Sequence, residues 1–255
     1  MTPPGVEVAV LGPVAVRGAA HPFRRAASLD LVVYLAFHRR RLRHADWASA
    51  LWPDRSVSSA TVHSTASDAR RALGRSADGA PLLSRGSQPL LHESVTSDVD
   101  RFAALVQRGS PDDLLAALRL VRGPFFAGLQ RADWTVFDGT RGDLESLVAD
   151  AALRGADALL ACDRSAEAEW VVRRGLVASP FDERLYRALL RATAAGANRV
   201  GLRAALVHIL TLAGERAPAR ADGATALTCF DPETTTLYRD LLRGVPATGG
   251  LPARL

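Results

Sequence analysis

The residues best suited to binding chemistry lie between positions 58 and 74, where the sequence is SSATVHSTASDARRALG. The stretch has helical spacing, but small hydroxyl residues, a histidine and paired arginines stand where large apolar side chains would fill a core. Small side chains let a backbone approach another surface closely, and arginine binds phosphate or the O6 and N7 atoms of guanine. The side chains with this chemistry are those of His63, Ser64, Ser67, Arg70 and Arg71.

This predicted helix has one narrow apolar stripe. The stripe is formed by Val62, Ala66, Ala69 and Leu73, and it is wide enough to anchor a helix on a core. The opposite, polar face suits the major groove of DNA. Serine, threonine and arginine also cover the outside of ordinary solvated helices, and spacing alone favours that interpretation over DNA binding.

Two strands and two helices are expected before this stretch. Residues 6–17 alternate valines around a Gly-Pro pair and predict strand, turn and strand. Residues 25–40 change to a helical period. A short helix follows, with Trp47 and Trp52 as core residues, and Pro53 ends it.

A hairpin is expected after the stretch. Residues 79–95 hold two short apolar runs separated by a polar tip that contains Arg85. Strand pair, three helices and a hairpin form the layout of a winged helix, whose third helix enters the major groove while the hairpin reaches the neighbouring backbone or minor groove. We therefore predict a winged-helix DNA-binding domain over residues 1–96, with residues 79–95 as its wing.

The rest of the chain is predicted to be helical almost to its end. Asp163-Arg164 and Asn198-Arg199 lie 35 residues apart, each in a turn between two apolar helical segments. A period of about 34 residues is typical of tetratricopeptide hairpins, although two units can also arise by chance in a helical bundle. The predicted fold class is mainly α, with an all-α tetratricopeptide-like domain over residues 97–255 behind the winged helix.

The charge distribution separates these two regions. All 32 basic residues are arginines, and the net charge is +5 over residues 1–95 but zero over residues 96–255. Five of the six histidines also lie in the first region. This asymmetry indicates a nucleic-acid-facing module joined to a neutral one. An anionic membrane is the rival partner, but no predicted helix sets a dense basic face against a broad apolar one.

Enzymatic chemistry has no candidate residues. The chain has no lysine, no nucleophile elbow, no HExxH and no glycine-rich phosphate loop. Cys162 and Cys229 are far apart and lack metal-ligand spacing, and His208 is expected to be a packed histidine. We expect no catalysis, no cofactor and no metal. The first ten residues lack signal-peptide features and the longest apolar run, 31–37, cannot span a bilayer, so we expect a cytoplasmic protein without a membrane partner.

The basic run HRRRLRH at 38–44 is compatible with a solvated helix end or with phosphate contacts beside the groove. The second possibility also applies to Arg24, Arg25 and Arg55. In the DNA-binding hypothesis His63, Ser64, Ser67 and Arg71 face bases or groove walls, and Arg70 binds phosphate. The full set of candidate DNA-binding residues is His63, Ser64, Ser67, Arg70, Arg71, Arg55, Arg43 and Arg85.

Eight stretches together resemble a known family. They are VAVLGPVAV (8–16), ALWPD (50–54), TVHSTASDARRALG (61–74), SDVDRF (97–102), LRLVRGPFFAGL (118–129), Trp134, VASPFDERLYRALLRA (177–192) and DPETTTLYRDLL (231–242).

In this content and order the chain resembles the actinobacterial antibiotic-regulatory transcriptional activators, which join an OmpR/PhoB-like winged helix to a tetratricopeptide-type bacterial transcriptional activation domain. The resemblance implies a sequence-specific regulator, most simply an activator, that binds double-stranded DNA. It also implies that the helical half contacts RNA polymerase, a sigma factor or a second copy of the chain.

Two departures from the family's pattern keep a second hypothesis open. Asp68 puts a carboxylate where these helices often carry a basic or amide residue, and phosphates would repel it. Pro89 stands where a wing strand would need an amide. The alternative is a protein-interaction adaptor whose winged helix has lost strong DNA binding and whose helical domain docks a partner.

Overall fold

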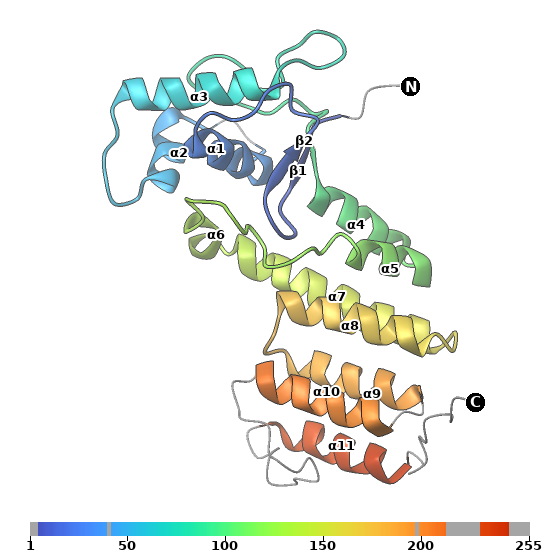
Figure 1. The fold of residues 1–255 in the computed structure, drawn as a ribbon. Helices are drawn as coiled ribbons and strands as arrows, with labels where there is room; N and C mark the ends of the chain where they lie inside the picture. The colour runs from blue at the N-terminus through green and yellow to red at the C-terminus, as the bar shows by residue number, and fades with distance from the viewer. Residues whose placement is uncertain (1–4, 40–41, 197–198, 213–229, 245–255) are drawn as a thin grey trace, which may run out of the picture. The chain divides into compact units, whose positions relative to one another are not determined.

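The computed structural model describes residues 5–39, 42–196, 199–212 and 230–244 (Figure 1). The chain forms two compact units, of which the first contains residues 1–104 and 120–144 and the second contains residues 105–119 and 145–255. The predicted division of function at residues 96 and 97 stays a prediction.

A small sheet forms one part of the first unit. Strands β1 (Glu7–Ala9) and β2 (Ala15–Arg17) pair antiparallel, with Val8 opposite Val16. They confirm the strand pair predicted from the valine alternation. β3 (Thr96–Ser97) pairs parallel to β1 on its other side. Two residues cannot show an alternation, so the sequence did not predict this strand.

Three helices complete the predicted layout, namely α1 (Ala26–Phe37), α2 (His44–Leu51) and α3 (Ser59–Leu73). Trp47 and Trp52 are buried, as expected of core residues. α1 is buried along most of its length and packs against α2 and α3. The basic run at 38–44 therefore begins after α1 has ended at Phe37, and Arg40 and Arg41 within it lie outside the described residues.

The boundaries of α3 follow from its end residues. The Ser58 hydroxyl accepts a hydrogen bond from the Thr61 amide and caps the helix. Gly74 ends it with φ of 83°, a conformation that glycine adopts without strain. The predicted stripe of Val62, Ala66, Ala69 and Leu73 is buried, so α3 is anchored on the core by small side chains.

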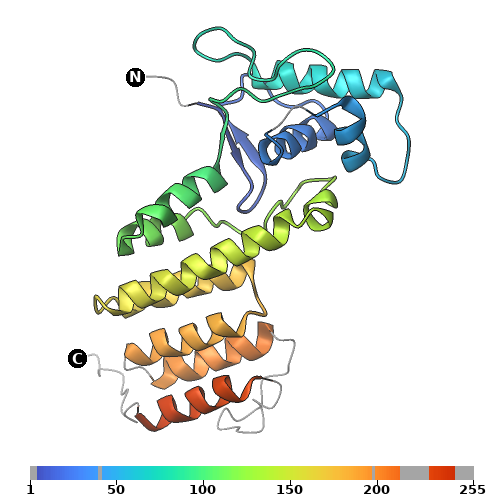
Figure 2. The same cartoon turned by 180° about the vertical axis from the view of Figure 1, so that it is seen from behind.

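The wing, residues 79–95, closes with little strand pairing. Leu83 and Leu91 form an isolated antiparallel bridge, and the Ser84 amide donates to the Leu90 carbonyl at 2.9 Å. Pro89 is buried, and the Leu90 amide donates to the Ser84 hydroxyl at 2.9 Å. The hairpin therefore forms without the amide that proline lacks. In Figures 1 and 2 it extends beside the end of α3.

Residues 120–144 pack on the sheet of the first unit. The Arg122 and Phe126 amides donate to the carbonyls of Leu11 and Val10, and the Val14 amide donates to Ala127. A short helix, α6 (Trp134–Phe137), lies in this segment. These are contacts between residues more than 100 positions apart, and no sequence spacing predicts them.

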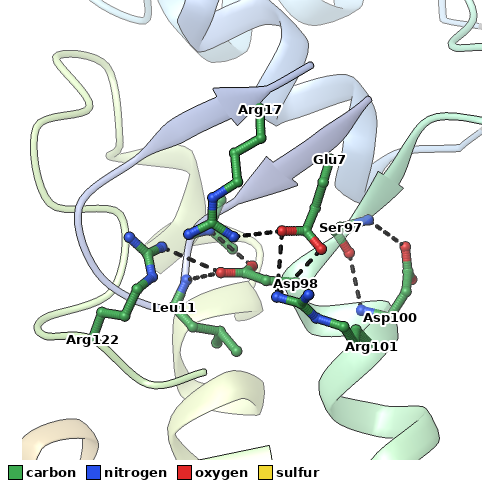
Figure 3. Close-up of polar contacts among 9 residues, drawn as sticks. Glu7, Leu11, Arg17, Ser97, Asp98, Asp100, Arg101 and Arg122 are labelled. Carbon is green, nitrogen blue, oxygen red and sulfur yellow. Dashed lines mark hydrogen bonds and ion pairs between the residues drawn. The ribbon is translucent and has the colours of Figure 1, made fainter. Parts of the chain in front are cut away.

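A buried carboxylate joins this segment to the sheet (Figure 3). Asp98 is 1% exposed and accepts hydrogen bonds from the amides of Val10 (2.8 Å) and Leu11 (3.1 Å). The Arg122 guanidinium lies 3.3 Å from the same carboxylate. Burial raises the pKa of Asp98, and the two amides and Arg122 oppose that rise.

Asp100, two residues along, has a different role in α4 (Asp98–Arg108). Its carboxylate accepts from the Ser97 amide at 2.8 Å, and its own amide donates to the Ser97 hydroxyl at 3.0 Å. This reciprocal pair is a capping box. The stretch 97–100 thus uses one carboxylate to begin a helix and another to fix the sheet.

A second buried carboxylate holds the far end of the segment. Asp30 of α1 is 1% exposed, accepts a hydrogen bond from the Gln130 amide at 3.3 Å and pairs with Arg131 at 2.8 Å. Residues 122–131 are therefore fixed at both ends by an arginine on a buried acid, and each arginine offsets part of the hydration that its acid has lost.

The second unit consists of stacked helices (Figures 1 and 2). They are α5 (Pro111–Leu118), α8 (Ser165–Ala178), α9 (Glu183–Ala195), α10 (Arg199–Leu212), α11 (Pro232–Gly244) and most of α7 (Thr140–Leu160).

The two predicted hairpins are confirmed as α7 with α8 and α9 with α10, although Asn198 of the second turn lies outside the described residues. Asp163, in the first turn, has φ of 58°. α7 and α8 approach closely at Gly175, where a Cβ atom would lie 2.7 Å from that of Ala152. The mainly helical fold class predicted from the sequence is correct. None of the helices in the described ranges is long and apolar enough to cross a membrane.

The two neighbouring carboxylates should differ in their effect on stability. Asp98→Ala leaves buried amides and Arg122 without their partner and should lower the free energy of unfolding by about 3 kcal/mol. Asp100→Ala removes an exposed cap and an exposed ion pair with Arg39 at 3.2 Å, and it should cost about 1 kcal/mol. Urea unfolding followed by circular dichroism measures both, and equal losses would contradict the assignment of Asp98 as the buried tie.

Candidate nucleic-acid interface

An open groove of about 960 Å³ lies between α3 and the wing, and we call it the α3–wing groove. None of the residues described along it is acidic, and six are arginines or histidines. The lining residues are His44, His63, Ala66, Ser67, Arg70, Arg71, Gly74, Arg75, Pro81, Arg85, Gly86 and Ser87. A concave cationic surface beside a helix of small side chains is suited to a polyanion.

Five side chains of the groove are exposed, including that of Ser87 in the wing. His63 and Ser67 project from α3, Arg75 follows its end, and Arg85 is at the wing tip. The Arg75 guanidinium donates to the Gly79 carbonyl at 2.6 Å. The Arg85 side chain forms no hydrogen bond or ion pair with any other residue that the structure describes. These groups can meet a ligand without breaking contacts within the core.

Arg70 connects α3 to the wing. Its Nε donates to the Leu83 carbonyl at 3.2 Å, and its Nη2 donates to the Ser84 carbonyl at 2.9 Å. Burial and the charge of Arg85 lower the pKa of Arg70 from its ordinary value. Two donors of one planar fork therefore fix two successive carbonyls of the hairpin, and Arg70 serves to position the wing.

Arg71 is also engaged within the protein. Its guanidinium donates to the Asp68 carboxylate at 2.6 Å and to the Pro22 carbonyl at 3.2 Å. The other oxygen of Asp68 accepts from the amides of Arg24 (3.1 Å) and Arg25 (3.3 Å), which directly precede α1. A negative charge at a helix N-terminus is favourable, so Asp68 ties α3 to the start of α1.

The sequence suggested that Asp68 would face a DNA ligand, but the structure places it elsewhere. Its side chain is only 9% exposed and does not line the α3–wing groove. Burial raises its pKa, but hydrogen bonds from Arg71, Ser28 and the Arg24 amide outweigh burial and keep the pKa below its ordinary value. The charge is therefore neutralised locally, and the objection that it would repel phosphate loses its structural basis.

The candidate residues fall into two groups. The groove brings together His63, Ser67, Arg70, Arg71 and Arg85. The half-buried Ser64 lies outside it, because its hydroxyl donates to the Thr61 carbonyl and accepts from Arg25. Arg43 pairs with Asp46 at 3.1 Å within the capping box of α2. Arg55 is exposed in the loop between α2 and α3.

Of the six arginines and histidines in the groove, two were absent from the candidates, namely His44 and Arg75. Arg75 directly follows Gly74, and the helix-ending glycine was a signal that the next side chain leaves the helix. His44 begins α2, and its ring meets that of His63 edge to face at 5.1 Å. Burial lowers the pKa of His44, and His63 lowers it further. No spacing within the sequence predicts this contact between two helices.

The Asp68 contacts predict a pH-dependent loss of stability. Because the folded pKa lies below the ordinary value of 3.8, the charged carboxylate stabilises the fold above that pH, and this contribution disappears as the pH falls through the folded pKa. Asp68→Asn should therefore lower the free energy of unfolding by about 1 kcal/mol at pH 7, and the difference should shrink steadily as the pH is lowered below the ordinary value of 3.8. Exposed Asp54, replaced by asparagine, should change stability by less than about 0.5 kcal/mol. A difference between wild type and Asp68→Asn that stayed constant as the pH was lowered from 7 to the acid limit of the folded protein would contradict this account.

The helical part of the chain matches a known family. Residues 93–207 match the model of the bacterial transcriptional activator domain. No curated protein matches the chain.

Among solved structures, EmbR of Mycobacterium tuberculosis, determined in complex with a low-affinity phosphopeptide, has a similar fold. The TM-score is 0.65 at 22% sequence identity, over 95% of this chain and 66% of the EmbR chain. The chain thus spans slightly less than two thirds of that relative's length. The likeness confirms the fold of an N-terminal winged helix followed by a helical domain. Over residues 93–207, which make up less than half of the chain, the sequence is similar to the bacterial transcriptional activator domain family.

Proposed function

We propose that this transcriptional regulator binds double-stranded DNA in the α3–wing groove, with α3 in the major groove and the wing on the neighbouring backbone or minor groove. The observation that carries the proposal is the groove itself, which gathers six arginine or histidine side chains and no lining carboxylate. A surface of this kind attracts phosphates, and an α-helix fits the width of the major groove.

The contacts within the protein suggest a division of roles along the groove. His63 and Ser67 are exposed on α3 and would face base edges, where small side chains allow close approach. Arg75 and Arg85 would bind phosphate. Arg70 and Arg71 are held by carbonyls and by Asp68, so we assign them to positioning the wing and α3.

The remaining candidates would act at the margins. Arg55 is exposed, and Arg43 is exposed beside its partner Asp46. Both lie outside the groove lining, so they would reach only phosphates that flank the site. Ser64 would contribute indirectly, since its hydroxyl accepts a hydrogen bond from the Arg25 guanidinium.

The family of residues 93–207 supports a role in activation. We propose that the winged helix selects the DNA while the helical unit contacts RNA polymerase, a sigma factor or a second copy of the chain. The competing adaptor function requires no DNA binding, so a direct binding measurement separates the two hypotheses.

A salt-titrated binding assay tests the DNA hypothesis. Fluorescence anisotropy with duplexes from the protein's own gene neighbourhood should show affinity that falls steeply between about 50 and 200 mM salt. Arg85→Ala should weaken binding to all duplexes and reduce the salt slope by about one unit. Arg203→Ala, an exposed arginine of α10, should change neither. Negligible binding at low salt would remove the DNA hypothesis and leave the adaptor.

A double-mutant cycle tests the role of Arg70. If Arg70 positions the wing, Arg70→Ala should weaken DNA binding and also remove most of the benefit of Arg85. Arg85→Ala should then cost about tenfold in the wild-type background, which is about 1.4 kcal/mol, and less than about twofold with Arg70→Ala. Additive losses would show that Arg70 binds phosphate independently. Circular dichroism of each variant verifies that the fold is retained.

A further inference from the structure

A second groove lies in the helical unit, between α8 and α10, and we call it the α8–α10 groove. Its volume is about 380 Å³. It is lined by Trp170, Arg173, Arg174, Leu176, Val177, His208 and Leu212. α8 and α10 are the second helices of the two hairpins. None of these residues takes part in the proposed DNA contacts, so the groove requires a separate explanation.

The floor of the groove is apolar where a helix surface is usually polar. Val177, which lines the groove, is 39% exposed. Trp170 is half-buried, whereas Trp47, Trp52 and Trp134 are all buried in the core. Tryptophan and arginine at the centre of a surface groove are the residues most enriched at energetically important positions of protein interfaces.

The rim of the groove is cationic. The Arg174 guanidinium lies 5.1 Å from the centroid of the Trp170 ring, and it forms no hydrogen bond or ion pair with the other residues described. Arg173, which also lines the groove, pairs with Glu169 at 2.8 Å. The residues that line the groove include no carboxylate. The positive charge of Arg174 is therefore available to an acidic ligand.

His208 belongs to the same rim. Burial lowers its pKa, and the charge of Arg173 lowers it further. A neutral imidazole packed beside Leu212 extends the apolar floor, which agrees with the expectation that this histidine is a packed residue. The groove thus combines an apolar floor with one unpaired cation at its edge.

From this combination we propose that the α8–α10 groove binds an acidic amphipathic segment of a partner protein. The segment would place a large apolar side chain against Trp170 and Val177 and a carboxylate beside Arg174. Carboxylate pairing with arginine gives orientation, and burial of the apolar side chain gives affinity. The chemistry of the lining selects this partner over nucleic acid, since phosphates gain nothing from the apolar floor.

Trp170 provides a direct test in the intact chain. The probe is a synthetic helical peptide of about 15 residues, with leucine at positions i, i+3, i+4 and i+7 and glutamate on its flanks. A matched peptide carries lysine in place of each glutamate. The acidic peptide should shift the tryptophan emission with saturation, and it should bind at least about tenfold more tightly than the lysine peptide. The emission change should be absent in Trp170→Phe, while anisotropy of a labelled peptide still reports binding.

Charge reversal makes the assignment specific. Arg174→Glu should lower the affinity for the acidic peptide and raise the affinity for the lysine peptide. Arg203→Glu, on an exposed part of α10, should alter neither affinity. Val177→Glu should weaken binding of the acidic peptide, because it replaces apolar surface in the floor of the groove with a carboxylate. Thermal melts confirm that each variant is folded. Equal binding of both peptides, or an unchanged preference in Arg174→Glu, would overturn the proposal.

Binding of the peptide should be independent of DNA. Arg85→Ala, which tests the DNA hypothesis, should leave peptide affinity unchanged. Failure of DNA binding therefore does not affect this inference, and failure of peptide binding at millimolar concentration overturns it alone.

Discussion

The buried carboxylate of Asp98 is the constraint on which the first unit depends. It takes the amides of Val10 and Leu11 from the sheet and the guanidinium of Arg122 from a distant segment. Asp30 repeats the arrangement with Arg131. An isolated buried carboxylate would be costly, so each acid requires its arginine. The sheet, α1 and residues 122–131 are consequently held in one register, and α3 packs on the framework that they form.

The arginines of α3 show how contacts within a fold limit what a helix can offer a ligand. Arg70 and Arg71 are adjacent in sequence, and both were candidates for DNA. In the structure one holds the wing and the other holds Asp68. Arginine suits such tasks because its planar fork satisfies two acceptors at once. The exposed cations of the groove are instead Arg75 and Arg85, which lie beyond the end of the helix.

Much of this architecture followed from local sequence. The helical spacing of residues 58–74 gave α3, the valine alternation gave β1 and β2, and the period of about 34 residues gave the helical hairpins. These features depend on residues close together in the chain. The partners of Asp98 do not, because they lie 24 to 88 positions away. Asp68 has one near partner, Arg71, but the two amides that it accepts from lie 43 and 44 positions away. Because these partners cannot be identified from the sequence, the Asp68 carboxylate was expected to repel phosphate. The contact of His44 with His63 also depends on packing between two helices. The spacing of residues within either helix does not predict it.

The sparse pairing of the wing has a consequence for the behaviour of the protein at high concentration. A hairpin with a regular ladder presents a row of unpaired amides and carbonyls along its outer strand, and such an edge can recruit a strand from another molecule. Here Pro89 removes one donor, Ser84 uses its hydroxyl on the Leu90 amide, and Arg70 covers the carbonyls of Leu83 and Ser84. These contacts occupy backbone groups of the wing through which chains could otherwise aggregate edge to edge.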